Sequence, residues 1–467
     1  MASNLSISIK LLVDKKKNRV LYAESDHAFV DILFSFLTLP MGTITRLLCT
    51  KSSVSEIGCM RNLYYSVNDL STTYLRTDAC KKMLLYPHRA AEAECRKLKF
   101  NLEGRKNKEL YLCGAFSSEC MLGVYYGVPC FCGAIMNHKA YLDESSCASG
   151  GDHADSEGVF VKGALGEGYI ISDDLQVMPG SISSCMSMLD KLGIGDDMSS
   201  IEERIVTVGS QEILQLLRRS WCSHTALTDV FLSNQGAIGI SIIRSAIRKE
   251  KEKAIMNVAD KKFKLKLVLR KSTEDVLYAE AEPDFINQLL SFLTFPLGSV
   301  FNLFVDSTSS SKLENDEKKN TVIADGLVVR NPKSPFPDAK TGGGFVKGPS
   351  RFMITDDLVL TPLSHTSCLL FLKTLNVRFD DIEEHVVNVG ENEVLNLLKA
   401  SLISDTALST LVGNTDVIYS VVQNQEMEVG FGIQANRCYC SFQNLLEGKC
   451  KSENHNFMLP SANSNDL

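Results

Sequence analysis

An internal duplication is the feature that most constrains the fold of this chain. Residues 10–48 align without a gap with residues 266–304, and seventeen of the 39 aligned positions are identical. Average composition would give roughly one identity in fifteen positions, so chance does not explain the match. Both copies contain VLYAE, which is followed by SFLTLPMG in the first copy and by SFLTFPLG in the second. We therefore expect the two copies to share a fold.

A second block recurs later in each copy. FVKG and SDDLQVMP occupy residues 160–163 and 172–179, and FVKG and TDDLVLTP occupy residues 345–348 and 355–362. The match then continues through IEERIVTVG and TAL to IEEHVVNVG and TAL. The repeated letters are mostly apolar positions and turn residues, so they describe an architecture and do not identify an activity.

Alternation of apolar and polar residues predicts a β-hairpin at the start of each copy. Apolar side chains occur at nearly every second position over residues 5–13, and again over residues 263–269, as in a strand with one buried face. Each such segment is followed by a polar stretch and then by VLYAE. Two strands joined by a short polar turn form a hairpin.

Helical spacing of apolar residues follows each hairpin. Residues 29–37 carry an apolar stripe with i, i+3, i+4 spacing, which predicts a helix with Asp26 as its N-cap. We expect Pro40 and Gly42 to end this helix. The pattern indicates an α+β fold, in which each half has a β-hairpin plus helix unit and a strand–helix unit.

The strand–helix unit of the first half is predicted in five pieces. Short strands are expected near Phe160 and at residues 169–171, followed by a helix at residues 181–189. A strand at residues 204–208 and a helix at residues 213–217 complete the unit.

These patterns predict the organisation of the whole chain. Residues 1–240 form the first repeat half, with a Cys-rich insert at about residues 95–150. Residues 241–262 are dense in alternating charge and form a connector, and residues 263–412 form the second repeat half. The tail, residues 413–467, has no clear period, so we expect it to be partly disordered.

Composition excludes several classes of protein. Hydrophobic residues make up 44% of the 467 residues, which is normal for a chain that buries cores. The net charge of −7 gives no general attraction to nucleic acid or to anionic membranes. No signal peptide and no apolar run of about 18 residues are visible. Fifteen cysteines in such a chain favour a reducing compartment, so we expect a cytoplasmic or nuclear protein without membrane contact.

Three motifs together resemble one protein family. These are KLLVDKKKNRVLYAE with LPMGTITRLL, then GCMRNLYYSVNDL, and then FVKG with SDDLQVMPGS and IEERIVTVG. The chain up to about Leu411 resembles a plant-specific family defined by a domain of unknown function, number six-seven-four. The resemblance implies a duplicated intracellular plant protein, often with a cysteine cluster, and it brings no established activity or catalytic residue.

The insert contains the group of residues with the clearest chemical potential. Four cysteines lie within 20 residues, and two of them are followed by glycine, which eases tight turns; they are Cys113, Cys120, Cys130 and Cys132. Four thiolates are a ligand set for one structural zinc, although the spacings of six residues and one residue differ from standard knuckles. His138 and Cys147 are substitutes for one ligand. The alternatives are buried thiols without metal and a redox or nucleophilic cysteine.

Paired aspartates occur at equivalent places in both halves. Asp173 and Asp174 correspond to Asp356 and Asp357. Adjacent carboxylates can serve acid/base chemistry, but neighbouring side chains in an extended chain point to opposite faces, and an aspartate that caps its own turn is commoner. We therefore expect no catalytic residue here, and no bound cofactor other than the candidate zinc.

The function predicted from these features is a non-enzymatic intracellular binding or scaffold protein with a candidate structural zinc site. Its partner is expected to be a protein. One alternative is a small-molecule enzyme with a cleft between the two halves. The other is a nucleic-acid-binding zinc module, supported only by the basic residues between positions 96 and 108.

Overall fold

The computed structural model describes most of both repeat halves. The described residues are 6–48, 58–89, 91–100, 102, 109–115, 122–130, 132–141, 158–161, 168–194, 198–232, 262–305, 322–323, 327–330, 332–333 and 343–412. All of the predicted connector except Lys262, the whole predicted tail and part of the Cys-rich insert lie outside these residues.

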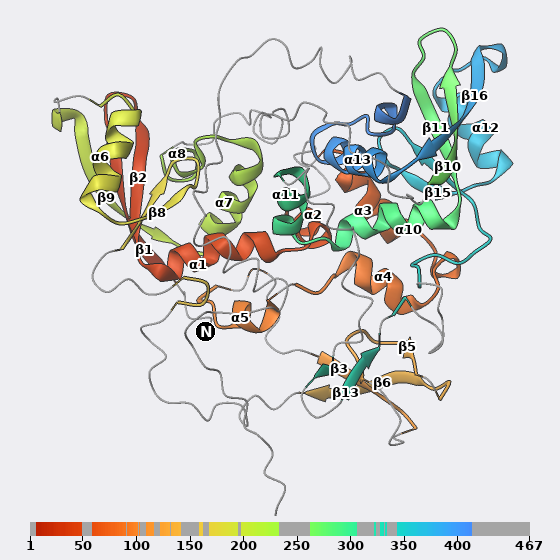
Figure 1. The fold of residues 1–467 in the computed structure, drawn as a ribbon, viewed down its shortest axis with the longest axis horizontal. Helices are drawn as coiled ribbons and strands as arrows, with labels where there is room; N and C mark the ends of the chain where they lie inside the picture. Colours follow the sequence, from red (N-terminus) through yellow and green to blue (C-terminus); the bar gives the residue numbers. More distant parts are fainter. Residues whose placement is uncertain are drawn as a thin grey trace, which may run out of the picture. The chain divides into compact units, whose positions relative to one another are not determined.

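The first half contains an antiparallel sheet of five strands (Figure 1). Its strands are β1 (Ile7–Asp14), β2 (Arg19–Ser25), β7 (Tyr169–Ser172), β8 (Val177–Pro179) and β9 (Ile201–Val208). Their order across the sheet is β8-β7-β2-β1-β9. The central hairpin of β1 and β2 is therefore extended on each side by strands from the second repeated block.

The second half contains a sheet of the same design. Its strands are β10 (Phe263–Arg270), β11 (Val276–Ala281), β14 (Phe352–Thr355), β15 (Leu360–Pro362) and β16 (Ile382–Val389). Their order, β15-β14-β11-β10-β16, repeats that of the first sheet strand for strand. The α+β class and the repeated hairpin-plus-helix units predicted from the sequence are confirmed.

Both hairpins share details of backbone geometry. The register shifts by one residue between Leu12 and Val13 in the first hairpin, and between Val268 and Leu269 in the second. Each turn contains one non-glycine residue with positive φ, Asn18 at 45° and Glu274 at 60°. The alternation works as predicted, because the Ile7, Ile9, Leu11 and Val13 side chains of β1 are all buried in the core.

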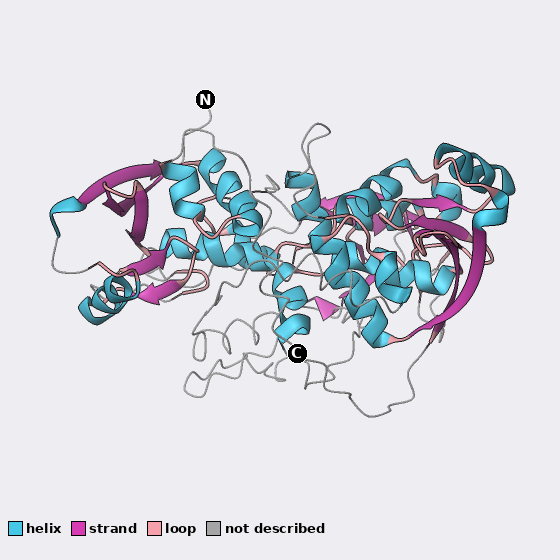
Figure 2. Cartoon of the chain, turned by 90° about the horizontal axis from the view of Figure 1, so that it is seen from above, coloured by secondary structure: helices cyan, strands magenta, loops and turns pink. Residues whose placement is uncertain are grey.

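Both halves also contain helices, with the 3-10 turns that accompany them. The α-helices of the first half are α1 (His27–Ser35), α2 (Met41–Leu48), α3 (Met60–Asp69), α4 (Asp78–Leu85), α5 (Glu92–Arg96), α6 (Ile182–Lys191), α7 (Ser210–Cys222) and α8 (Ala226–Phe231). Those of the second half are α10 (Pro283–Ser291), α11 (Leu297–Val305), α12 (His365–Thr374) and α13 (Glu391–Ile403). The 3-10 turns are η1 (Phe36–Thr38), η2 (Thr72–Tyr74), η4 (Met198–Ser200), η6 (Phe292–Thr294), η8 (Phe379–Asp381) and η9 (Leu408–Val412). Figure 2 shows helices (cyan) packed beside the curved strands (magenta) of the sheets.

Each sheet has helices on both faces. The inner face joins the main core together with α1 or α10, and Phe29 and Phe285 are 0% and 2% exposed there. The outer face is covered in part by α6 or α12, each of which builds a small separate cluster around Tyr22 or Tyr278. None of the helices in the described ranges is long and apolar enough to cross a membrane.

The predicted start of α1 is confirmed, and its predicted end is corrected. The Asp26 carboxylate accepts hydrogen bonds from the backbone amides of Ala28 and Phe29. The helix ends before Pro40, but Gly42 lies inside the next helix, α2, and does not end α1. Gly42 is required for packing, since a Cβ atom there would lie 2.8 Å from the Leu84 carbonyl oxygen.

The strand predicted near Phe160 is wrong, because this segment consists of bends. The backbone amides of Val159, Phe160 and Val161 instead donate to the buried carboxylate of Asp31. In the second half, the amides of Phe345 and Val346 donate to Asn287, the counterpart of Asp31. The first FVKG motif is thus held by hydrogen bonds to a side chain on α1. The other predicted elements form β7, α6, β9 and α7, although β9 begins three residues earlier than expected.

The two SFLT-x-P segments bind each other. The Met41 amide donates to the Phe295 carbonyl oxygen over 2.9 Å, and the Leu297 amide donates to the Leu39 carbonyl oxygen over 2.9 Å. Exchanging the two repeats turns one bond into the other. Pro40 and Pro296 lie opposite each other there, in an isolated antiparallel β-bridge. The most strongly repeated motif is therefore also the contact between the copies.

The chain after α2 packs against the second sheet. The Asn62 amide group on α3 donates to the Asp357 carbonyl and carboxylate oxygens, over 2.9 Å and 3.1 Å. The Ser66 hydroxyl accepts a hydrogen bond from the Leu360 amide on β15. This amide belongs to an edge strand, and Leu360 is only 2% exposed. A helix from the first half thus covers an edge of the second-half sheet.

Truncating a core phenylalanine tests the role of α1. We expect Phe29→Ala to lower the free energy of unfolding by about 3 to 5 kcal/mol, because it leaves a cavity beneath α1. Chemical denaturation measures the change. Ile205→Ala on the solvent side of β9 is the matched control, since Ile205 is 71% exposed. Equal stability of the wild type and Phe29→Ala would contradict the described packing.

Candidate metal centre

A third, mixed sheet of short strands carries the cysteine cluster. Its strands are β3 (Glu109–Cys113), β4 (Leu122–Gly123), β5 (Val128–Pro129), β6 (Ile135–Tyr141), β12 (Val322–Ile323) and β13 (Leu327–Arg330). They follow the order β12-β13-β4-β3-β6-β5, and β13 pairs in parallel with β4. Figure 1 labels β3, β5, β6 and β13 of this sheet. This sheet therefore combines the Cys-rich insert of the first half with two strands of the second half.

Three of the four predicted ligands come together in this sheet. Cys113 ends β3, and Cys130 and Cys132 follow β5. The three Sγ atoms all lie within 4.8 Å of one another, with 3.2 Å between those of Cys113 and Cys132. Cys113 and Cys130 are buried, whereas Cys132 is exposed. Cys120, the fourth predicted ligand, lies outside the described residues, as does the substitute Cys147.

A tight turn explains how cysteines separated by one residue face the same point. The Cys130 amide donates to the Ala134 carbonyl oxygen over 2.8 Å, and the Gly133 amide donates to the Cys130 carbonyl oxygen over 3.0 Å. Gly133 has φ of 83°, a conformation that glycine adopts without strain. On the other side, a register shift between Leu112 and Cys113 changes the local twist at the end of β3.

The spacing of the sulfur atoms fits a metal bound by thiolates. Zinc–sulfur bonds of about 2.3 Å in a tetrahedron place neighbouring sulfur atoms about 3.8 Å apart. The observed 3.2 Å and the 4.8 Å limit bracket that value. The Ala115 amide also donates to the Cys113 sulfur over 3.5 Å, which favours the thiolate form. These three cysteines could hold a metal ion, with one tetrahedral position left for a further ligand.

The His138 imidazole lies near the cluster without belonging to it. His138 is on β6 opposite Leu112, and its Nε2 atom would lie 3.2 Å from a Cβ atom added to Gly114. Its ring nitrogens are not among the donor atoms that lie within 4.8 Å of all three sulfur atoms. As described, His138 therefore does not complete the ligand set.

Other cysteines of the first half serve as packing residues. Cys59 and Cys80 are buried, and their thiols donate to the carbonyl oxygens of Ser401 and Pro332. Burial raises the pKa of both thiols above the ordinary value. A raised pKa disfavours the thiolate, so neither residue is suited to metal binding or nucleophilic chemistry at neutral pH.

The paired aspartates anchor short helical segments. Asp173 is 4% exposed and accepts hydrogen bonds from the Thr228 amide and hydroxyl, and from the Arg19 guanidinium over 3.0 Å. In the second half, Asp356 accepts from the amide and hydroxyl of Ser409. The second aspartate of each pair accepts from a hydroxyl two residues earlier. The expected bond within the turn is thus made by Asp174 and Asp357, whereas Asp173 and Asp356 bond to residues 55 and 53 positions later in the chain.

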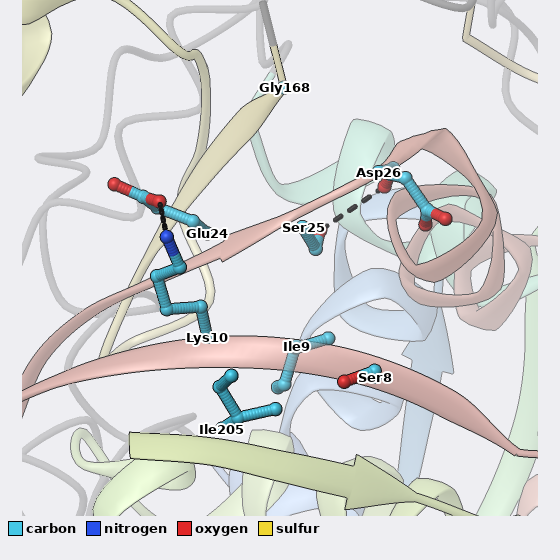
Figure 3. A pocket seen from close by; sticks show the side chains of 8 residues that line it. All are labelled: Ser8, Ile9, Lys10, Glu24, Ser25, Asp26, Gly168 and Ile205. Carbon is cyan, nitrogen blue, oxygen red and sulfur yellow. Dashed lines mark hydrogen bonds and ion pairs between the residues drawn. The ribbon is translucent and has the colours of Figure 1, made fainter. Parts of the chain in front are cut away.

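A shallow hollow of about 410 Å³ lies beside the first sheet (Figure 3). Both carboxylates that line it are occupied: Glu24 pairs with Lys10 over 3.5 Å, and Asp26 caps α1. Among the described residues, its lining contains neither cysteine nor histidine. This hollow therefore lacks the combination of groups that acid/base or nucleophilic catalysis requires.

Replacing a buried aspartate tests its anchoring role through pH. Burial raises the pKa of Asp356 in the folded protein above its ordinary value. Above this raised pKa the buried carboxylate is ionised and lowers the stability of the fold. The loss fades as the pH falls through the raised pKa toward the pKa of the unfolded chain. Asp356→Asn keeps an acceptor for the Ser409 amide without the charge. We expect Asn to stabilise the protein most at neutral pH, and the gain to shrink as pH falls.

Denaturation of wild type and variant between pH 7 and pH 4 measures this difference. Asp173→Asn is the control, because it also removes the ion pair with Arg19 and should gain less. A gain from Asp356→Asn that grows as pH falls would refute the assignment.

Comparison with known proteins gives one match. The sequence model of a family described as protein of unknown function (DUF674) matches residues 3–315 and 304–392. Comparison with curated proteins and with solved structures finds no match. The two matched segments span the Cys-rich insert and most of both repeat halves, so the chain belongs to the DUF674 family.

Proposed function

We propose that this protein is a non-enzymatic binding or scaffold protein in which Cys113, Cys130 and Cys132 hold a structural zinc ion. The convergence of the three sulfur atoms within 4.8 Å carries this proposal. Thiolate ligands are typical of structural zinc, whereas catalytic zinc sites keep an open position and usually include histidine. Cys120 is the proposed fourth ligand, since it completes a set of four thiolates from the same insert.

The composition of the third sheet supports a structural role for the metal. The insert contributes the strands β4 and β5, and each of them has only two residues. Such short strands bury little apolar surface of their own. A metal supplies folding energy that such a small element cannot obtain from a core. Because β13 pairs with β4, an ordered insert would also hold a strand of the second half in place.

The roles of the polar residues favour binding over catalysis. The repeated aspartates are used for hydrogen bonds that stabilise the fold, and the described lining of the hollow beside the first sheet contains no histidine and no cysteine. The net charge of −7 disfavours nucleic acid as a ligand, so we propose a protein partner. A reducing compartment, cytoplasmic or nuclear, would keep the cluster thiols available for metal.

Metal analysis of cysteine variants tests the zinc site. We expect one zinc ion per chain in protein purified under reducing conditions without added chelator. Cys132→Ser should lose most of this zinc, because serine is a poor zinc ligand, and the exposed position should tolerate the change. Cys185→Ser on α6, away from the cluster, is the control and should keep its zinc. Absence of stoichiometric zinc, or a Cys113–Cys132 disulfide found by mass spectrometry, would overturn the site.

Removal of the metal tests whether it is structural. A chelator should increase amide hydrogen exchange in β3, β5 and β6, because the metal then no longer ties their ends together. Exchange in β1 and β10, which lie in the central hairpins of the large sheets, should stay unchanged. Uniform exchange with and without chelator would show that the metal does not order the insert.

A further inference from the structure

The geometry of the candidate metal centre suits a second chemistry, which is the oxidation of two of its thiolates. We propose that hydrogen peroxide converts Cys113 and Cys132 into a disulfide and so expels the zinc ion. This step rests on the proposed function, since it adds a means of regulation to the same site. The zinc-bound cluster and the disulfide are then two states of one site.

The sulfur atoms of this pair lie close together. The Sγ atoms of Cys113 and Cys132 are 3.2 Å apart. A disulfide joins sulfur atoms about 2.0 Å apart, so the two need to approach each other by only about 1 Å. Cys113 ends β3 and Cys132 follows β5, so a bond between them links the end of a strand to the neighbouring turn.

The turn that carries Cys132 has room for this approach. The two backbone hydrogen bonds described in this turn join Cys130 to Gly133 and Ala134, so they do not hold Cys132 directly. A Cβ atom added to Gly133 would meet no atom within 4 Å, which shows open space beside the backbone there. A small movement of the turn therefore meets no steric obstacle at Gly133.

Exposure selects Cys132 as the thiolate that meets the oxidant. Cys132 is exposed, whereas Cys113 and Cys130 are buried. Metal ligation keeps a cysteine in the thiolate form, and the thiolate is the nucleophile. Burial instead raises the pKa of the Cys59 and Cys80 thiols, so these two stay protonated and react poorly with peroxide.

The reaction balances in two steps. The Cys132 thiolate attacks one oxygen atom of hydrogen peroxide, so the O–O bond breaks, an S–O bond forms and hydroxide leaves. The Cys113 thiolate then attacks the sulfur of this sulfenic acid, so an S–S bond forms and a second hydroxide leaves. The two thiolates lose two electrons and the peroxide gains them. Both hydroxides take up protons from solvent to form water, and zinc, which has lost two ligands, leaves as the hydrated ion.

Oxidation changes which parts of the third sheet are held together. Zinc ties the end of β3 to both Cys130 and Cys132, whereas the disulfide ties it to Cys132 alone. Strand β3 pairs with β4, which in turn pairs with β13 of the second half. The oxidation state of the cluster therefore acts next to the contact between the insert and the second half. Disulfides in reducing compartments are usually transient, so the cell's thiol reductants would reset the site.

Zinc release and disulfide mapping test this switch in the full chain. The protein is prepared under reducing conditions, loaded with zinc, freed of reductant and treated with hydrogen peroxide. A colorimetric chelator measures the released zinc, and mass spectrometry maps the disulfides after free thiols are blocked. We expect one Cys113–Cys132 disulfide for each zinc ion released, with Cys59 and Cys80 still present as thiols. Dithiothreitol and added zinc should restore the starting state.

Two serine variants test the assignment of the pair without depending on the metal. In Cys130→Ser, peroxide should still form the Cys113–Cys132 disulfide, because both of its sulfur atoms remain. In Cys113→Ser, Cys132 loses its partner and should carry several-fold more sulfenic acid than in the wild type, as measured by trapping with dimedone. Cys185→Ser on α6 is the matched control and should respond to peroxide as the wild type does.

Amide hydrogen exchange distinguishes the disulfide state from simple loss of metal. Exchange in β3 should be slower in oxidised protein than in chelator-treated protein, because the disulfide still holds the end of this strand. Equal exchange in the two samples would contradict the cross-link.

The zinc content before treatment separates the two proposals. Protein that contains no zinc before peroxide is added would overturn both of them. Zinc-loaded protein that keeps its metal and its cluster thiols at a peroxide concentration that oxidises free cysteine would overturn the switch alone. A disulfide in the wild type that joins any other pair of cysteines would also overturn it.

Discussion

The two hydrogen bonds between the SFLT-x-P segments are the contact on which the arrangement of the two halves depends. In each copy the residue after the proline donates its amide, and the residue before the proline accepts through its carbonyl oxygen. Helices α2 and α11 begin directly after these prolines. Because the contact is the same when the copies are exchanged, it has the symmetry of an isologous dimer interface. The proline supplies no amide of its own, so the residues on either side of it make both bonds. Gly42 then allows α2 to approach the Leu84 and Leu293 carbonyl oxygens.

Local sequence signals predicted the repeated units well, because their geometry depends on neighbouring residues. Alternation in β1, the Asp26 cap and the bond from the Ser172 hydroxyl to Asp174 all follow from patterns within about ten residues. The failures were non-local. Bends near Phe160 exist because their amides bond to Asp31, which lies about 130 residues earlier, and nothing in the local pattern reports that contact. The crossing of α3 to the second sheet was missed for the same reason.

The candidate metal site was predictable in composition and not in geometry. Four cysteines within a short insert indicated thiolate ligation, and three of them meet. The spacing of Cys130 and Cys132 argued against the site, since one residue between two ligands leaves little chain for a turn. The structure provides that turn through the backbone of Gly133 at positive φ and the hydrogen bond from Cys130 to Ala134. The participation of β13 from the second half had no signal in the insert.

The crossing of α3 also has a consequence for how the chain is made. Ser66 and the Leu360 amide that it satisfies are separated by 294 residues. During synthesis from the N-terminus, α3 therefore leaves the ribosome long before the strand β15 that it contacts, at rates of about 5–20 residues per second. Helices α2 and α4 of the first half can cover α3 during that interval, but its contact with β15 can form only after the second sheet emerges.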